Sequence, residues 1–136
     1  MQRLKTRAQF QAALASSLIA KSTHFAMHQV EFNLLAAPQL SVLFPSQVLW
    51  AGAMVPKRWA KRAVTRNTIK RQIYTAMSGL NNGSAQAAFL IRQRREFSRQ
   101  MFPSATSPEL RRAVRVELLD LLQAAQTNPH KRAPAT

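Results

Sequence analysis

Basic side chains are the most numerous groups in this sequence that could take part in chemistry. Seven of the twenty lysines and arginines fall in the fifteen positions from Lys57 to Arg71, and the nearest acids are Glu31 and Glu96. The seven are Lys57, Arg58, Lys61, Arg62, Arg66, Lys70 and Arg71. Cations without matching carboxylates attract polyanions, and nucleic acid is the first of these. The segment therefore predicts a nucleic-acid contact.

The same segment has a helical period from about residue 62 to 77. At 100° per residue its apolar side chains fall in one arc, which must face a core. They are Ile69, Ile73, Ala76 and Leu80. Arg66, Lys70 and Tyr74 form a row along the border of this arc. Asn67 and Arg71 point further toward solvent. Guanidinium groups beside an amide and a phenol suit RNA, since they grip phosphates and stack on unpaired bases, although duplex DNA remains an alternative.

Other candidate catalytic groups are sparse. His24 and His28 share one face of a predicted strand, ~13 Å apart at ~3.3 Å per residue, which is too far to share a metal ion or a proton. Glu117 and Asp120 lie three residues apart on a predicted helix, where ion pairs with neighbouring arginines explain them. The chain also lacks a Gly-rich phosphate loop, a Ser/His/Asp set and an HExxH motif. An active site built from protein alone is therefore not predicted.

The composition describes one soluble, strongly basic domain. The 136 residues carry a formal net charge of +15, 46% of them are hydrophobic, and there is no cysteine. We expect a single RNA-binding domain over residues 1–126 and a flexible basic tail over 127–136. No apolar run is long enough to span a membrane, and no apolar segment follows the basic start as a secretion signal would require. The expected location is the cytoplasm, with no membrane partner.

Three helices and three strands must position the basic segment. A Thr6/Gln9 capping box starts a helix over residues 6–19, whose apolar side includes Phe10 and Leu14. Strands are predicted at 23–35, 47–55 and 87–92, with the basic helix between the last two. Residues 36–46 read as a hairpin connection with room for a short edge strand at 40–44. Ser107-Pro108-Glu109 starts a last helix that runs to about residue 126.

The basic helix also carries a resemblance to a known family. The stretch AVTRNTIKRQIYTAM, residues 63–77, resembles the helical motif of the bacterial ribonuclease P protein component, in which valine precedes Arg-Asn-Arg, an aliphatic residue and Lys-Arg. Five positions match: Arg66, Asn67, Ile69, Lys70 and Arg71. Thr68 stands where the family usually has its second arginine. The entrance RLKTRAQFQAAL and the strand ending in Pro56-Lys57-Arg58 are also similar to the family, so the likeness covers roughly residues 3–95.

This resemblance implies an α+β fold like the second domain of ribosomal protein S5. Three helices would pack around a small mixed sheet of about four strands, with an unusual left-handed βαβ crossover. In that family the RNA subunit and its bound Mg²⁺ carry out the cleavage, and the protein binds no metal by itself. The protein subunit, one per catalytic RNA, helps remove the 5′ leader of precursor tRNA and so forms the mature tRNA 5′ end.

The resemblance also assigns roles to individual residues. Phe10 and Leu14 on the first helix and His28 on the first predicted strand would line a cleft for the single-stranded leader. His28 stands where the family often has a phenol. The RNA-facing set would be Lys57, Arg58, Lys61, Arg62, Arg66, Asn67, Lys70 and Arg71. A ribosomal or other structural RNA-binding protein is the alternative, followed by a basic DNA-binding module.

Overall fold

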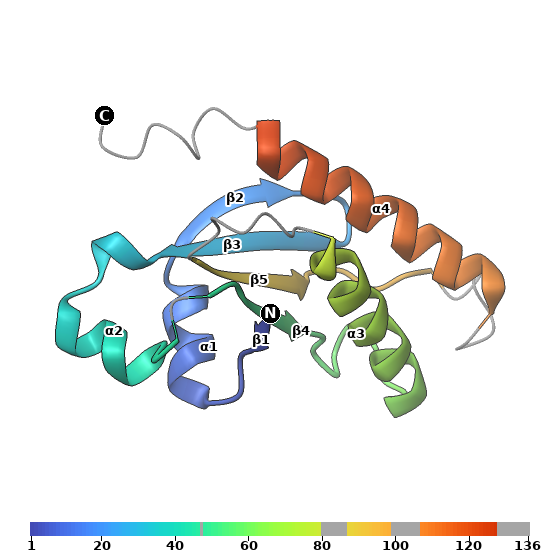
Figure 1. Ribbon diagram of the computed structural model, residues 1–136. Helices are drawn as coiled ribbons and strands as arrows, with labels where there is room; N and C mark the ends of the chain where they lie inside the picture. Colours follow the sequence, from blue (N-terminus) through green and yellow to red (C-terminus); the bar gives the residue numbers. More distant parts are fainter. Residues whose placement is uncertain (47, 80–86, 99–106, 128–136) are drawn as a thin grey trace.

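Helices separate most of the short strands along the chain, except that β2 is followed directly by β3 (Figure 1). The computed structural model describes residues 1–46, 48–79, 87–98 and 107–127. Its elements are β1 (Gln2–Arg3), α1 (Arg7–Leu14), β2 (Ser17–Lys21), β3 (Phe25–Glu31), a 3₁₀ turn (Phe32–Leu34), α2 (Ala37–Leu43), β4 (Trp50–Met54), α3 (Ala63–Ser78), β5 (Ala87–Gln93) and α4 (Pro108–Thr127).

The strands form one mixed sheet in the order β1-β4-β5-β3-β2. The β1–β4 and β4–β5 pairs are parallel, whereas β3 is antiparallel to both β5 and β2. The parallel neighbours β4 and β5 are consecutive strands, and α3 lies between them in the chain. This arrangement confirms the predicted α+β class, the mixed sheet and the strand–helix–strand unit around the basic helix.

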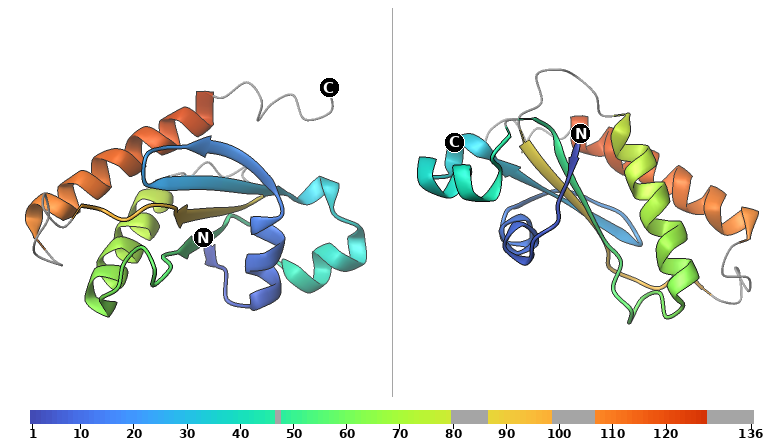
Figure 2. Two further views of the ribbon diagram at one scale, coloured as in Figure 1. Left: turned by 180° about the vertical axis from the view of Figure 1, so that it is seen from behind. Right: turned by 60° about the horizontal axis from the view of Figure 1, so that its bottom comes forward.

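Helices cover both faces of the sheet (Figure 2). On one face, α3 and α4 pack over Phe25, Met27, Phe89 and Ile91 to form the larger apolar core. On the other face, α1, the 3₁₀ turn and α2 enclose a smaller core whose buried members include Phe44 and Trp50. Alternate residues of β3 and β5 therefore serve different cores, as the period of two in a strand requires.

The first helix is shorter than predicted. α1 ends at Leu14 with Ala15 as its C-cap, and Ser17–Lys21 is β2, so the predicted helix over 6–19 was wrong in its last turn. The cause is local, because the hydroxyl of Ser16 donates to the carbonyl of Ala13, and serines compete with helical hydrogen bonds in this way. The Thr6/Gln9 capping box itself is confirmed.

Residues 37–43 form a helix where the sequence predicted a hairpin connection or edge strand. Pro38 lies in the first turn of α2, where its missing N–H costs no helical hydrogen bond. Leu43 and Phe44 are buried on one side of α2. The spacing of Leu40, Leu43 and Phe44 is i, i+3, i+4, which is helical, and a hydrogen bond from Gln9 of α1 to the Leu43 carbonyl fixes the end of α2. With α2, β1 and β2 included, the described residues form four α-helices and five strands, whereas three helices and about four strands were expected.

The remaining helices follow the predicted pattern. On α3, Ile69 and Ile73 are buried and Ala76 is partly buried. The Ser107 hydroxyl accepts from the backbone N–H of Leu110 at 3.1 Å, which confirms the predicted cap of α4. The buried face of α4 is Leu110, Val114, Leu118, Leu121, Leu122 and Ala125. Leu80 and the tail from residue 128 onward lie outside the described residues.

Candidate RNA-binding surfaces

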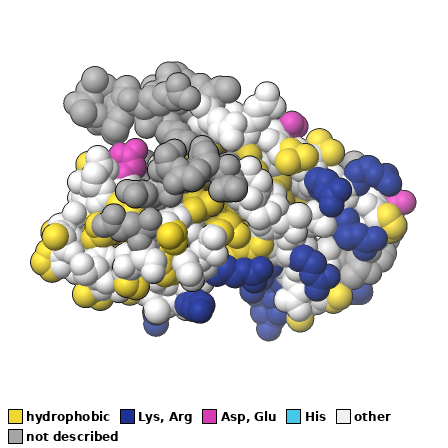
Figure 3. Space-filling view, viewed as in Figure 1, with side chains coloured by type: hydrophobic (Ala, Val, Ile, Leu, Met, Phe, Trp, Pro, Cys, Tyr) yellow, Lys and Arg dark blue, Asp and Glu magenta, His cyan; other side chains and the backbone are white. Residues whose placement is uncertain are grey.

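The helix α3 separates an apolar side from a cationic side. Ile69, Ile73 and Met77 are at most 1% exposed against the sheet and α4. Lys70 and Arg71 are exposed on the opposite side, as is Asn67. In the view of Figure 1, Lys and Arg side chains gather over α3 and the neighbouring part of α4, whereas the half over α1 and α2 is mostly apolar or uncharged (Figure 3).

Arg66 differs from the other cations of the segment. Its guanidinium Nη1 donates to the carbonyl of Ala60 at 3.0 Å and to that of Lys61 at 2.8 Å, and the residue is half-buried. The helix N-cap, Arg62, makes no side-chain cap hydrogen bond. Arg66 therefore ties the loop before α3 to the first turn of the helix. It positions Lys61 and Arg62, and this role was not evident from the sequence.

Hydrogen bonds to the backbone hold the loop from Lys57 to Arg62 in place. The backbone N–H groups of Trp59 and Ala60 donate to the carbonyl of Pro56, which makes a tight turn directly after β4. Gln93, buried on β5, donates to the Trp59 carbonyl at 3.3 Å. The Arg58 guanidinium lies 5.1 Å from the centre of the Trp59 ring, within range of a cation–π contact. The exposed side chains of this loop are Lys57, Arg58, Lys61 and Arg62.

The first helix is anchored by one buried amide. The Oε1 of Gln9 accepts from the backbone N–H groups of Lys5 and Thr6, and its Nε2 donates to the carbonyl of Leu43 at the end of α2. Phe10, next along the helix, is half-buried against the smaller core. Leu14 keeps 39% of its surface exposed. Of the predicted cleft residues on this helix, Leu14 thus offers free apolar surface and Phe10 offers part of its ring.

His28 lies in the middle of β3 and is 6% exposed. Its Nε2 accepts from Nε of Arg92 at 3.1 Å, so the proton of the neutral ring belongs on Nδ1, which faces the Ser16 carbonyl at 3.3 Å. Burial lowers the pKa of His28, and the nearby charge of Arg92 lowers it further, against the opposing effect of the Ser16 carbonyl. The ring is therefore held neutral, with both nitrogens already engaged within the protein.

The predicted cleft residues lie on the side of the sheet that α1 covers. α1 packs over β3 and β5, and Leu18 of β2 is the cross-strand partner of His28. Leu18 is 47% exposed, so the sheet beyond α1 presents an apolar side chain next to the imidazole. Arg92, the partner of Ala26 across the β3–β5 pair, adds a half-buried guanidinium. Sequence reasoning missed Leu18 and Arg92, since Leu18 was assigned to a helix and the register was unknown.

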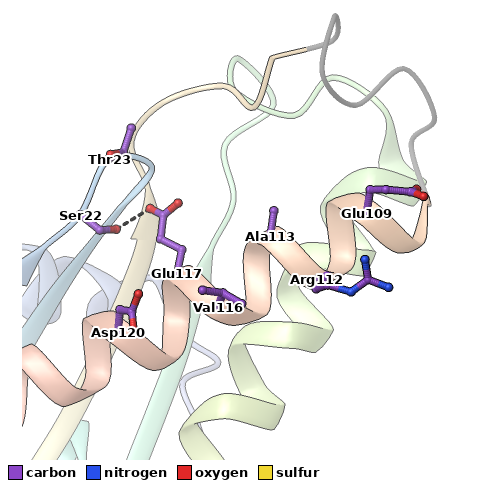
Figure 4. A pocket seen from close by; sticks show the side chains of 8 residues that line it. All are labelled: Ser22, Thr23, Glu109, Arg112, Ala113, Val116, Glu117 and Asp120. Atoms are coloured by element: carbon purple, nitrogen blue, oxygen red, sulfur yellow. Dashed lines mark hydrogen bonds between the residues drawn. The ribbon is translucent and has the colours of Figure 1, made fainter.

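A hollow lies between the β2–β3 connection and α4 (Figure 4). Its central acid is Glu117, whose Oε2 accepts from the Ser22 hydroxyl at 2.5 Å and from the His24 backbone N–H at 2.7 Å. Its Oε1 lies 2.7 Å from His24 Nδ1. Figure 4 shows Glu117 pointing toward Ser22, while Arg112 extends from another part of the helix. The predicted ion pair of Glu117 with an arginine of its own helix was wrong.

His24 lies on the opposite side of the sheet from His28, contrary to the predicted shared face. It precedes β3, where the strand alternation has not begun, and its ring stacks on Phe97 with the ring centres 3.9 Å apart. This position locks the end of β3 to α4. The cluster of Ser22, His24 and Glu117 is therefore a structural connection between the β2–β3 turn and α4.

Metal-ligating residues are not gathered in the part of the chain that the structure describes. No three His, Asp or Glu side chains there come close enough to hold a metal ion. Of the described helices, none combines the length and the apolar character that crossing a bilayer requires.

Comparison with known proteins decides the family. The family model described as Ribonuclease P matches residues 1–118. The chain belongs to the ribonuclease P protein family. It is thus a protein subunit of a ribonucleoprotein that processes tRNA, and RNA is its partner. No match was found among curated protein sequences.

Solved structures agree with the family at the level of the fold. The ribonuclease P protein of Staphylococcus aureus, solved at 2.0 Å, shares 18% identity and a TM-score of 0.64, over 94% of this chain and 98% of the other. A mutant of that protein, described as defective in mRNA degradation activity, gives a TM-score of 0.61 at 18% identity, over 91% of this chain and 87% of the other. At this identity the likeness shows a common fold.

Proposed function

We propose that this ribonuclease P protein binds the catalytic RNA through the exposed cations of α3 and the loop before it. The supporting observation is that Lys70 and Arg71 are exposed on the side of α3 opposite its buried side, that the four cations of the loop are exposed beside them, and that no described carboxylate forms an ion pair with any of these side chains. Arginine forks and lysines in such an array bind phosphates, and their contribution is electrostatic. The surface comprises Lys57, Arg58, Lys61, Arg62, Asn67, Lys70 and Arg71, with Arg66 holding the loop beneath it.

In this proposal the 5′ leader of precursor tRNA binds in the predicted cleft, between α1 and the edge of the sheet at β2. Leu14 and Leu18 supply exposed apolar surface, and Phe10 supplies the edge of a ring. Unpaired bases stack on aromatic rings such as that of Phe10 with little dependence on sequence, and the two leucines add apolar contact area. His28 lies in the floor of the cleft. It is not assigned a hydrogen bond to the leader, because its ring nitrogens already bond Ser16 and Arg92. Because the ring is neutral, the attraction of leader phosphates at this place is assigned to the neighbouring guanidinium of Arg92.

The chemical step belongs to the RNA in this proposal. The described carboxylates and histidines do not assemble an oxygen-rich Mg²⁺ site on the protein, so Mg²⁺ is assigned to the RNA subunit. The protein raises the affinity for precursor tRNA and lowers the charge repulsion between two polyanions. One protein binds one catalytic RNA, and the complex works in the cytoplasm.

Reconstitution with the catalytic RNA of the same organism tests the proposal. The protein alone should not cleave precursor tRNA, whereas the complex should cleave it at low Mg²⁺ and bind it more tightly than mature tRNA. Replacement of Leu14 by Ala should reduce that preference severalfold. The matched control is Leu119→Ala, because Leu119 is an exposed leucine on α4, 52% accessible, far along the chain from the cleft. Equal affinity of the wild-type complex for precursor and mature tRNA would contradict the leader-binding role.

A further inference from the structure

A cationic hollow lies between β1 and α3, on the opposite side of the sheet from Leu4. It has a volume of about 500 Å³, in the range in which proteins bind small ligands. Its lining is Met1, Arg3, Asn67, Lys70, Arg71, Tyr74, Thr75 and Ser78. No acid lines it. Within the described residues, none of its cations forms an ion pair with a carboxylate.

Arg3 and Tyr74 form a stacked pair in the wall of this hollow. The guanidinium carbon of Arg3 lies 3.9 Å from the centre of the Tyr74 ring, at cation–π distance. The Tyr74 hydroxyl accepts from the backbone N–H of Ala53 on β4 at 3.3 Å, which fixes the far end of the ring. Arg3 itself is exposed on β1. The tyrosine therefore covers one side of the Arg3 guanidinium, and because Arg3 is exposed, part of this planar cation faces solvent.

The strand β1 holds Arg3 in this position. The backbone N–H groups of Gln2 and Leu4 donate to the carbonyls of Leu49 and Ala51, both at 2.8 Å. Leu4 is 4% exposed in the smaller core. Because side chains alternate along a strand, a buried Leu4 requires Arg3 to project to the α3 side. The stacked pair is thus built by elements some seventy residues apart in the sequence and is preorganised.

We propose that this hollow binds one unpaired nucleotide of the catalytic RNA. Its base stacks on the free face of the Arg3 guanidinium, and its phosphate lies between Lys70 and Arg71. Stacking on guanidinium planes is a usual way in which proteins hold unpaired bases in RNA. Asn67, exposed at the rim, offers both a donor and an acceptor to a base edge. The inference rests on the proposed attachment of α3 to RNA and adds β1 and Tyr74 to it.

Charge-conserving variants separate stacking from simple attraction. Arg3→Lys keeps the positive charge and removes the guanidinium plane. We expect it to weaken the complex with the catalytic RNA roughly five- to tenfold, with an unchanged salt dependence, since one stacked base contributes about that much. Arg115→Lys, on the exposed part of α4, is the matched control and should leave affinity within twofold. Tyr74→Phe should reproduce part of the loss, since it frees the ring from Ala53.

A photocrosslink locates the nucleotide. The chain has no cysteine, so Ser78→Cys gives a unique attachment point for a benzophenone at the rim of the hollow. Crosslinks mapped by primer extension should concentrate on one unpaired nucleotide and disappear with Arg3→Lys. Two results would rule out the nucleotide site: equal binding of the RNA by wild type and Arg3→Lys, or crosslinks that fall in a duplex. In either case the attachment of α3 to the RNA would still stand. If wild-type protein does not bind the catalytic RNA, the proposed function itself fails.

Discussion

Arg66 and Lys70 lie one turn apart on α3, yet their side chains meet different partners. Arg66 bonds two carbonyls of its own chain, while Lys70 opens into the hollow beside β1. The sequence treats them as equivalent members of a basic row. Whether such a cation stays available to a ligand or closes a loop depends on where free carbonyls lie, and here the carbonyls of Ala60 and Lys61 follow the Pro56 turn. In the same way, the pairing of Leu18 with His28 could not be predicted without the β2–β3 register.

His28 makes folding sensitive to acid. Burial lowers its pKa below the ordinary value of about 6.5, so the unfolded chain binds a proton more readily than the folded chain. Unfolding therefore takes up protons, and this contribution lowers the free energy of unfolding as the pH falls below about 6.5. It is absent above that pH, where both states carry a neutral ring.

The replacement His28→Gln should remove this part of the pH dependence. We expect the difference in unfolding free energy between wild type and variant to be constant above about pH 7 and to shrink on acidification toward pH 5. Urea unfolding at a series of pH values measures it. His24→Gln is the comparison variant, because His24 pairs with Glu117 on the other side of the sheet. A wild-type minus variant difference that does not change with pH would contradict the buried, neutral assignment.

At the scale of elements, the periodic parts of the fold were predictable and the edge strands were not. The spacing of Ile69 and Ile73 indicated the buried side of α3, and Ser107 indicated the start of α4. Those signals are local. The strand β1 is two residues long and forms by pairing with the edge of β4, so no local sequence pattern predicts it. The stacked pair of Arg3 and Tyr74 escaped sequence reasoning for the same reason.

Gly52 determines how closely β1 can approach the sheet. A Cβ at this position would lie 2.5 Å from Cδ1 and 3.0 Å from Cγ of Leu4. Both residues are buried, so the leucine has little room to move. Because Gly52 has no side chain, Leu4 can pack directly against β4 at this position, and this contact holds β1 close to the sheet.

Gly52→Ala should therefore destabilise the fold by about 1–3 kcal/mol through overpacking. Leu4→Ala alone should also destabilise it, because a buried side chain is lost. The double variant should be more stable than the sum of the two changes predicts, since the alanine Cβ fills space that the leucine has left. Denaturant unfolding of the four proteins gives the coupling. Simple additivity would show that Leu4 does not meet position 52.

At the scale of the whole molecule, the net charge of +15 exceeds what the α3 surface alone contributes. Three arginines also lie on α4, which packs against α3: Arg111, Arg112 and Arg115. Attachment to RNA could follow from this general field or from contacts at defined phosphates. The two differ in how affinity responds to salt, because each phosphate contact releases condensed counterions, whereas charges beyond about 10 Å are screened at 0.1 M salt.

Two double variants with equal net charge distinguish these cases. Lys57→Ala with Lys61→Ala removes two cations before α3, and Arg112→Ala with Arg115→Ala removes two exposed cations of α4. Each lowers the formal charge from +15 to 15 − 2 = +13. If the loop contacts phosphates, the first pair should reduce the slope of log affinity against log salt by about 1.4–1.8, at 0.7–0.9 per contact. The second pair should leave the slope unchanged. Equal reductions would mean that the catalytic RNA contacts α4 as closely as the loop, and the binding surface would then extend across both helices.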